Sequence, residues 1–120
     1  MIRKSSEIQP NVQKEFRGGT GETTILAFMN EQEANGAGRL FAKMVLEPGS
    51  SIGQHTHETE FEAYYILKGK ALVNDNGTEV TLEPGDAHIC PDGSFHSVKN
   101  VGNETLEFMA TILYTKQKEV

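Results

Sequence analysis

Cysteine is nearly absent from this chain, and long apolar runs are absent altogether. The sequence holds a single cysteine, Cys90, so no disulfide can form within the chain. A lone cysteine suits a reducing cytosol, where thiols stay unpaired. No stretch approaches the ~20 apolar residues that a membrane helix needs, and no apolar run follows Arg3 and Lys4 to indicate a signal peptide. We therefore expect a soluble, cytoplasmic protein with no membrane partner.

Basic residues are scarce relative to acidic ones. Eleven lysines and arginines stand against 17 aspartates and glutamates, which gives a formal net charge of −6 at pH 7. Nonspecific binding to a nucleic-acid duplex needs basic residues that displace counterions from phosphates, so nucleic acid is not an expected partner. The lysines within residues 116–119 are too few to form a nucleic-acid arm, and we interpret this segment as a solvated tail.

Long helical patterns and repeats are also missing, whereas glycine and proline turns occur throughout. Short segments with strand character lie between these turns, at residues 23–28, 39–47, 61–67, 70–74, 78–82, 94–99 and 106–115. Asn76 and Gly77 tolerate positive φ, so the segments on either side of them are expected to form a hairpin. Short strands at such spacing indicate an all-β sandwich or barrel.

The chain length of 120 residues fits a single domain. Within it, we expect residues 1–38 to form an N-terminal segment with one or more edge strands, and residues 39–115 to form the barrel. The glycine-rich run at 17–21 lacks the spacing and the lysine of a phosphate-binding loop. We interpret it as a flexible turn or edge segment, and residues 32–36 as a helical turn that ends at Gly36.

The last strand candidate predicts which side chains are buried. One alternating set is largely apolar and should face the interior: Leu106, Phe108, Ala110, Ile112 and Tyr114. The other set is mixed, and its Met109 and Leu113 indicate an outer face that is partly covered. A homodimer interface would produce such a face.

Three of the four histidines, together with one glutamate, form a pattern that suits a metal ion. His55 and His57 are two residues apart, on one face of an extended segment. Glu62 follows five residues later, and a β-fold can bring His96 alongside. Three imidazoles and a carboxylate suit a borderline divalent metal. From the residues alone, a surface His-x-His pair and a solvated glutamate remain the alternative.

Residues around this set resemble the two motifs of the cupin family. The first consists of Gly49, His55, His57, Glu62 and Gly69, and the second of Gly85, Pro91, Gly93, His96 and Asn100. All ten positions are filled, with the family's spacing. The resemblance implies an all-β jelly-roll barrel (a double-stranded β-helix), with the glycines and Pro91 in turns. It also implies that the three histidines and Glu62 ligate one metal. A degenerate cupin without metal is the alternative, although such members have usually lost a ligand.

Within the family, the chain resembles the small oxalate-decarboxylase-like cupins. Four protein donors leave open positions on an ion that accepts about six ligands, which is the arrangement of a catalytic metal. The resemblance implies a small carboxylate such as oxalate as the ligand. It favours manganese or iron, with nickel, cobalt, zinc and copper left open because His and Glu donors do not separate them.

Catalysis is a separate question from binding. The well-described decarboxylases have two cupin domains and a lid loop with a glutamate proton donor, and no such lid is recognisable in this sequence. Oxalate binding is therefore easier to support than oxalate decarboxylation. An iron-dependent dioxygenase, a metal-dependent isomerase and a non-catalytic small-molecule or metal-binding cupin are the alternatives.

Further side chains are candidates for the pocket around the metal. Tyr64 lies two residues beyond the glutamate ligand, so it should share the inward face, where its hydroxyl could hydrogen-bond a metal-bound ligand. A barrel aromatic whose hydroxyl bonds the backbone is the alternative, and the more common case. Phe108 is a second substrate-binding candidate, with core packing as its alternative. Arg39 is a candidate anion clamp. We interpret His88 as a packed or surface histidine, with contact to a metal ligand as the alternative, and Cys90 as a small buried residue.

Overall fold

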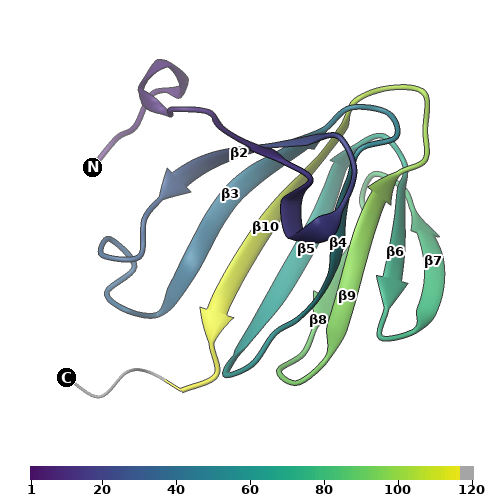
Figure 1. Ribbon diagram of the computed structural model, residues 1–120. Helices are drawn as coiled ribbons and strands as arrows, with labels where there is room; N and C mark the ends of the chain where they lie inside the picture. The colour runs from purple at the N-terminus through teal and green to yellow at the C-terminus, as the bar shows by residue number, and fades with distance from the viewer. Residues whose placement is uncertain (117–120) are drawn as a thin grey trace.

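The computed structural model describes residues 1–116, which form ten β-strands and two short 3-10 turns. The strands make two antiparallel sheets that face each other, as Figure 1 shows. The predicted all-β fold class is thereby confirmed. Residues 117–120, which include most of the tail interpreted as solvated, lie outside the described residues. Within residues 1–116, no helix is long and apolar enough to span a membrane.

The larger sheet has six strands in the spatial order β1-β2-β3-β10-β5-β8. Their bounds are β1 Asn11–Lys14, β2 Glu22–Met29, β3 Gly38–Leu46, β10 Leu106–Tyr114, β5 Glu60–Lys68 and β8 Ala87–Cys90. The C-terminal strand β10 lies between β3 and β5 and pairs antiparallel with both. Strands distant in sequence are therefore neighbours at the centre of this sheet.

The smaller sheet has four strands in the order β4-β9-β6-β7. Their bounds are β4 Ser51–Thr56, β9 Phe95–Asn100, β6 Ala71–Asp75 and β7 Thr78–Leu82. The expected hairpin joins β6 to β7, with positive φ at Asn76 and Gly77. The Gly77 amide donates a hydrogen bond to Asn74 Oδ1 at 2.8 Å, which fastens the turn.

All seven strands expected from the sequence are present, with ends that differ by at most one residue. The helical turn expected at residues 32–36 ends at Gly36, whose φ is 76°. Strands β1, β4 and β8 were not among the predicted segments. They are short, and the polar residues of β1 and β4 give no apolar alternation from which a strand could be recognised.

The core lies between the two sheets and follows the predicted alternation except at Tyr114, which is only partly buried at the end of β10 and hydrogen-bonds Glu31. In β10, Leu106, Phe108 and Ala110 are fully buried and Ile112 nearly so, whereas the residues between them are only partly buried. The larger sheet adds Met44, Leu46 and Ile66 to this core, and the smaller one adds Ile52, Val73 and Val98. Cys90 is buried as expected.

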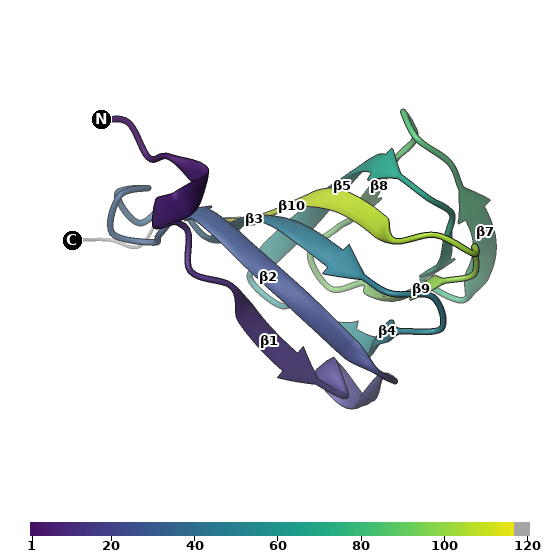
Figure 2. The same cartoon turned by 90° about the horizontal axis from the view of Figure 1, so that it is seen from above.

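The N-terminal residues extend the larger sheet and then return to the smaller one. Figure 2 shows β1 and β2 along one side of the molecule, with the helical turn after β1 close to β4. This turn, η2 (Phe16–Gly18), is followed by Thr20, whose carbonyl accepts a hydrogen bond from the Ser51 amide at 2.9 Å. The segment interpreted as a flexible turn is thus bonded to β4. A second 3-10 turn, η1 (Ser5–Glu7), precedes β1.

Candidate metal centre

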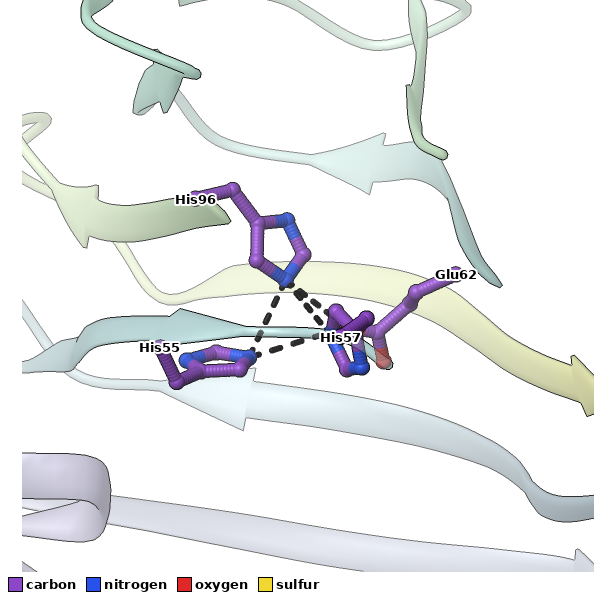
Figure 3. A group of neighbouring side chains, drawn as sticks. All are labelled: His55, His57, Glu62 and His96. Carbon is purple, nitrogen blue, oxygen red and sulfur yellow. Dashed lines mark hydrogen bonds and ion pairs between the residues drawn. The ribbon is translucent and has the colours of Figure 1, made fainter. Parts of the chain in front are cut away.

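Four side-chain donors converge at one point between the sheets. They are the Nε2 atoms of His55, His57 and His96 and the Oε1 atom of Glu62, drawn in Figure 3. His96 Nε2 lies 3.0 Å from the Nε2 of both other histidines and 3.0 Å from the Glu62 oxygen. One donor atom from each residue lies within 4.8 Å of all the others. The residues predicted as ligands are therefore brought together.

Strand register explains this convergence. His55 on β4 pairs with His96 on β9, so these two imidazoles are cross-strand neighbours in the smaller sheet. A register shift between Ile52 and His55 marks a bulge, and bulges re-aim side chains. Glu62 comes from β5 in the opposite sheet. His57 follows β4, where its amide donates to the Ser94 carbonyl at 3.1 Å.

The donor set fits a divalent cation. His96 is fully buried, and His57 and Glu62 are only 2% and 3% exposed. His96 Nε2 lies at hydrogen-bonding distance from two other ring nitrogens and from a carboxylate oxygen, and the single N–H of a neutral imidazole cannot satisfy all of these contacts. A cation among them accepts every lone pair at once, and the His/Glu donor chemistry suits a borderline divalent metal. This cluster could bind one metal ion.

Each imidazole is held from behind through its Nδ1 atom. His55 Nδ1 lies 2.7 Å from the Gly53 carbonyl, to which it donates. His57 Nδ1 lies 2.5 Å from Glu60 Oε2, and His96 Nδ1 lies 3.0 Å from His88 Nε2. Such partners fix the ring orientation and leave Nε2 free to ligate a metal.

Glu60 is itself held by an arginine. Arg39 Nε and one of its terminal nitrogens donate to the two Glu60 oxygens, each at 2.7 Å. This two-pronged pair joins Arg39 through Glu60 to His57. The hydrogen bond from Arg39 holds the pKa of Glu60 below its ordinary value against partial burial. Glu60 is therefore an ionised acceptor for the His57 N–H.

Burial and hydrogen bonding set the charges of the donors. Burial lowers the pKa of His55 to about 4, so this ring stays neutral. Burial alone would raise the pKa of Glu62, but its hydrogen bonds with His57 and His96 outweigh this and hold it at about 2. Burial opposes protonation of His57, yet hydrogen bonds with Glu62 and Glu60 leave its pKa raised. The site thus offers an ionised carboxylate and a neutral imidazole even in mildly acidic solution.

Three of the four donor residues, His55, His57 and Glu62, border a cavity of about 300 Å³. Apolar side chains form much of its wall, including Ile25, Leu40, Met44, Ile52 and Ile112. Polar side chains line the remainder, namely Asn11, Gln13, Arg17, Arg39 and Tyr64. A largely apolar cleft with a few convergent polar groups is the usual form of a small-molecule site.

The two predicted substrate-binding aromatics lie in different places. Tyr64 lines the cavity, and its ring stacks on His96 with centroids 5.2 Å apart. Burial raises its pKa well above the ordinary value, so its hydroxyl stays a donor. Phe108 packs behind it, with centroids 4.5 Å apart, in the fully buried core. Phe108 therefore supports the Tyr64 ring, and its contact with a substrate stays a prediction.

Three residues around the donors differ from the sequence expectation or were missed. His88 is packed, as one of the two interpretations held, and it also contacts His96, as the alternative held. Arg39 lines the cavity, but its guanidinium is engaged by Glu60. Glu60 and Glu58 both lie near the ligands in the sequence, and alternation predicts the direction of neither side chain with certainty. The position of Glu60, three residues after His57, was the only available signal, and it could not be distinguished from the exposed Glu58.

The sequence is similar to a known protein family and to characterised relatives over most of its length. A family model described as a cupin domain matches residues 42–112, more than half of the chain. An oxalate-binding protein from Thermotoga maritima is 44% identical over 113 residues, which cover 94% of this chain and 93% of the relative. A germin-like protein from Morus alba is 35% identical over 107 residues, covering 78% of this chain and 51% of the relative.

Solved structures agree with these sequence matches. The crystal structure of a predicted oxalate decarboxylase from Thermotoga maritima aligns with a TM-score of 0.91 at 44% identity, covering 95% of this chain and 99% of that one. The polyketide cyclase RemF from Streptomyces resistomycificus aligns with a TM-score of 0.71 over 99% of this chain and 83% of that one. At 21% identity, this second likeness concerns the fold alone.

Proposed function

We propose that this chain, which belongs to the cupin family, holds one divalent transition metal on His55, His57, Glu62 and His96 and binds a small carboxylate such as oxalate there. The convergence of three Nε2 atoms and one carboxylate oxygen carries this proposal, and three of these four donor residues line the cavity. The relative that is 44% identical over nearly its whole length is named an oxalate-binding protein, which supports oxalate as the ligand.

The charge of the site suits an anion. A divalent ion bound there would supply a Lewis-acid centre for carboxylate oxygens. Glu62 offsets only part of the charge of such an ion, so the centre keeps a net positive charge despite the acidic surface. The Tyr64 hydroxyl lies beside the metal-ligand candidate Glu62, to which it is hydrogen-bonded, and apolar side chains form much of the remaining cavity wall.

The cavity supports binding more directly than decarboxylation. Proton delivery to a carboxylate product needs an acid within hydrogen-bond reach of the substrate. Among the described residues that line the cavity, Glu62 is the only carboxylate, and its pKa of about 2 makes it a poor proton donor. Glu60, the nearest other carboxylate, is engaged by Arg39 and His57. We therefore propose a ligand-binding role first.

Manganese or iron is the metal that we propose. Neither is selected by the donor set, because mixed imidazole and carboxylate ligands accept most divalent first-row ions and availability decides among them. The oxalate-related name of the relative favours a hard, oxygen-seeking ion over copper or zinc.

Elemental mass spectrometry on protein purified without a histidine tag tests the metal site. We expect about one transition metal per chain in the wild type and none in His57→Ala, because removing one donor of a buried set weakens it strongly. Glu58→Gln is the matched control, since Glu58 is exposed and only one residue away. Full metal content in folded His57→Ala would refute the ligand assignment.

Calorimetric titration of the metal-loaded protein tests the ligand. We expect oxalate to bind with a stoichiometry of about one, and the heat to vanish after the metal is removed by a chelator. Acetate serves as the monocarboxylate control. A metal-loaded protein that binds no carboxylate would refute the proposed function while leaving the metal site intact.

We also propose a homodimer that buries the outer face of the larger sheet. Tyr65, Leu67 and Ile89 lie on this face and are 51%, 44% and 61% exposed. Cross-strand pairing places Met109 beside Tyr65 and Leu113 beside Phe61 on the same face. An exposed apolar surface of this kind is typical of a protein interface.

A cytoplasmic location completes the proposal. The lone Cys90 is fully buried, and burial raises its pKa to about 11, which suits an unpaired thiol in a reducing compartment. Fractionation of the native cells with an antibody against the chain tests this location.

A further inference from the structure

Arg17 stands at the cavity wall with an unusual backbone. Its φ of 56° and ψ of 31° fall in the left-handed region, which residues other than glycine seldom adopt. Its guanidinium carbon lies 5.9 Å from the centroid of the Phe16 ring, and both side chains line the cavity of the candidate metal centre. Left-handed residues that are not glycine concentrate at functional sites, where the surrounding structure holds them in place.

Close backbone packing holds Arg17 in this position. A Cβ atom on Gly53 would overlap the Arg17 carbonyl oxygen, and one on Gly19 would overlap the Ser51 carbonyl oxygen. Thr20 forms two hydrogen bonds with Ser51 at the start of β4. Its amide donates to Ser51 Oγ at 2.9 Å, and its carbonyl accepts from the Ser51 amide. The turn that carries Arg17 is therefore anchored to the strand that carries His55.

The two arginines of the cavity differ in how their charges are balanced. Arg39 forms a two-pronged pair with Glu60, so its charge is already neutralised. Among the ion pairs of residues 1–116, none involves Arg17. A divalent cation, less the charge of Glu62, would keep about one unit of positive charge, and Arg17 adds a second unit at the exposed rim of the cavity. Such a cavity matches a dianion better than a monoanion.

The wall near Arg17 also presents amide groups. Asn11 and Gln13 lie two residues apart on β1, on one face, and both line the cavity. Gln13 Nε2 donates to Asn11 Oδ1 at 2.7 Å, which leaves the Asn11 amide N–H groups available as donors. Arginine and amide donors together are the groups that recognise carboxylate oxygens.

We propose that Arg17 is a specificity-determining residue that holds the second carboxylate of a dicarboxylate whose first carboxylate is bound at the metal centre. This inference rests on the proposed function and narrows it from small carboxylates to small dicarboxylates. The N-terminal segment thereby completes a site whose other half lies in the barrel. At about 300 Å³, the cavity is at the lower end of small-molecule sites, which suits a ligand of this class.

Oxalate and oxamate provide a matched pair of ligands. Oxamate has the same shape but carries an amide in place of one carboxylate, so it keeps one negative charge. Calorimetric titration of metal-loaded wild type, Arg17→Gln and Arg17→Lys gives the ratio of the two dissociation constants for each protein. Lys14→Gln is the control, because it removes an exposed charge three residues away that does not line the cavity.

We expect Arg17→Gln to lower the preference for oxalate over oxamate by about tenfold or more, as for the loss of a charge-assisted hydrogen bond. Arg17→Lys should retain part of the preference, and Lys14→Gln all of it. Metal content should be unchanged in every variant. If Arg17→Gln does not fold, Arg17→Gly removes the same side chain and suits the left-handed backbone.

An unchanged oxalate-to-oxamate ratio in Arg17→Gln or Arg17→Gly would overturn the role of Arg17 while leaving oxalate binding at the metal intact. Equal losses of oxalate and oxamate affinity would also overturn it, because they indicate a general effect on the site. Failure of metal-loaded wild type to bind either ligand would overturn the proposed function, and this inference with it. Wild-type titrations therefore separate the two failures.

Discussion

The Nε2 atom of His88 lies 3.0 Å from the Nδ1 atom of His96. His88 is not one of the four candidate metal ligands, but it contacts one of them, His96, at the ring nitrogen that faces away from the cluster. If His96 Nε2 faces a cation, the neutral ring carries its proton on Nδ1 and donates it to His88. His88 must then accept through Nε2. Burial lowers the pKa of His88 and keeps the ring neutral, which leaves that acceptor free.

Replacing His88 tests this tautomer argument. We expect His88→Leu to weaken metal affinity by about 10–100-fold, the usual cost of removing a partner that orients a metal ligand. His88→Gln should restore part of the affinity, since its amide oxygen can accept the same proton. Competition with a coloured chelator measures both. The exposed Ile89→Thr serves as the control on the same strand.

Equal metal affinity in His88→Leu and wild type would show that His96 is oriented without His88. If His88→Leu and His88→Gln lose the same amount of metal affinity, with unchanged thermal stability, the imidazole is needed for its shape and not as a hydrogen-bond acceptor.

The four donors could be predicted because the motif positions fix them in sequence. The side chains that hydrogen-bond the donors could not be predicted, because their positions depend on the register between strands that are distant in sequence. His88 faces inward because β8 pairs with β5 so that it lies opposite Tyr64. A slip of one residue would turn it to the outer face. No pattern within β8, only four residues long, reveals that register.

Arg39 shows a second limit of sequence analysis. Simple alternation along β3 places Arg39 on the face of the strand opposite to Leu40, which would point it away from the cavity. The register between β10 and β3 shifts at this point, because Ile112 pairs with Leu40 and Leu113 with Gly38. A bulge of this kind re-aims the extra residue, and Arg39 reaches Glu60 and the cavity wall. Periodicity cannot predict where such a shift falls.

The stabilisation that a metal confers should depend on pH through His57. Its folded pKa is raised above the ordinary value of about 6.5, because hydrogen bonds with Glu62 and Glu60 outweigh burial. Protonated His57 therefore stabilises the metal-free protein below about pH 6.5, and this contribution is lost as pH rises through the folded pKa. Metal binding needs the same nitrogen deprotonated. Both effects make the metal-induced rise in Tm larger at high pH.

Differential scanning calorimetry at pH 6 and pH 8, with saturating metal and with chelator, measures this difference. We expect a larger rise in Tm at pH 8. The pKa of His55, at about 4, lies below this range, so His55 does not contribute. An equal rise at both values would show that no donor exchanges a proton for the metal between them.

Gly53 should be intolerant of a side chain. We expect Gly53→Ala to destabilise the fold by about 1–3 kcal/mol, as for other overpacked sites, because its Cβ would overlap the Arg17 carbonyl oxygen. Gly102→Ala is a matched control, since the nearest heavy atom to its Cβ would be 3.5 Å away, an ordinary contact. Urea unfolding measures both. Equal stability of the two variants would show that η2 moves from β4 at little cost.

The proposed dimer predicts that charges on the outer face of the larger sheet separate the protomers. Tyr65→Lys and Ile89→Lys together place two cations on a surface that the dimer would bury against its own copy, where neither has a partner. We expect the dimer dissociation constant to rise at least about tenfold, measured by sedimentation equilibrium. Val80→Lys introduces the same charge at a position of the smaller sheet that is 46% exposed and should leave the dimer intact.

A wild type that sediments as a monomer at all concentrations would contradict the dimer. Equal weakening by Val80→Lys would show that the loss does not depend on the outer face of the larger sheet, and would contradict its assignment as the interface.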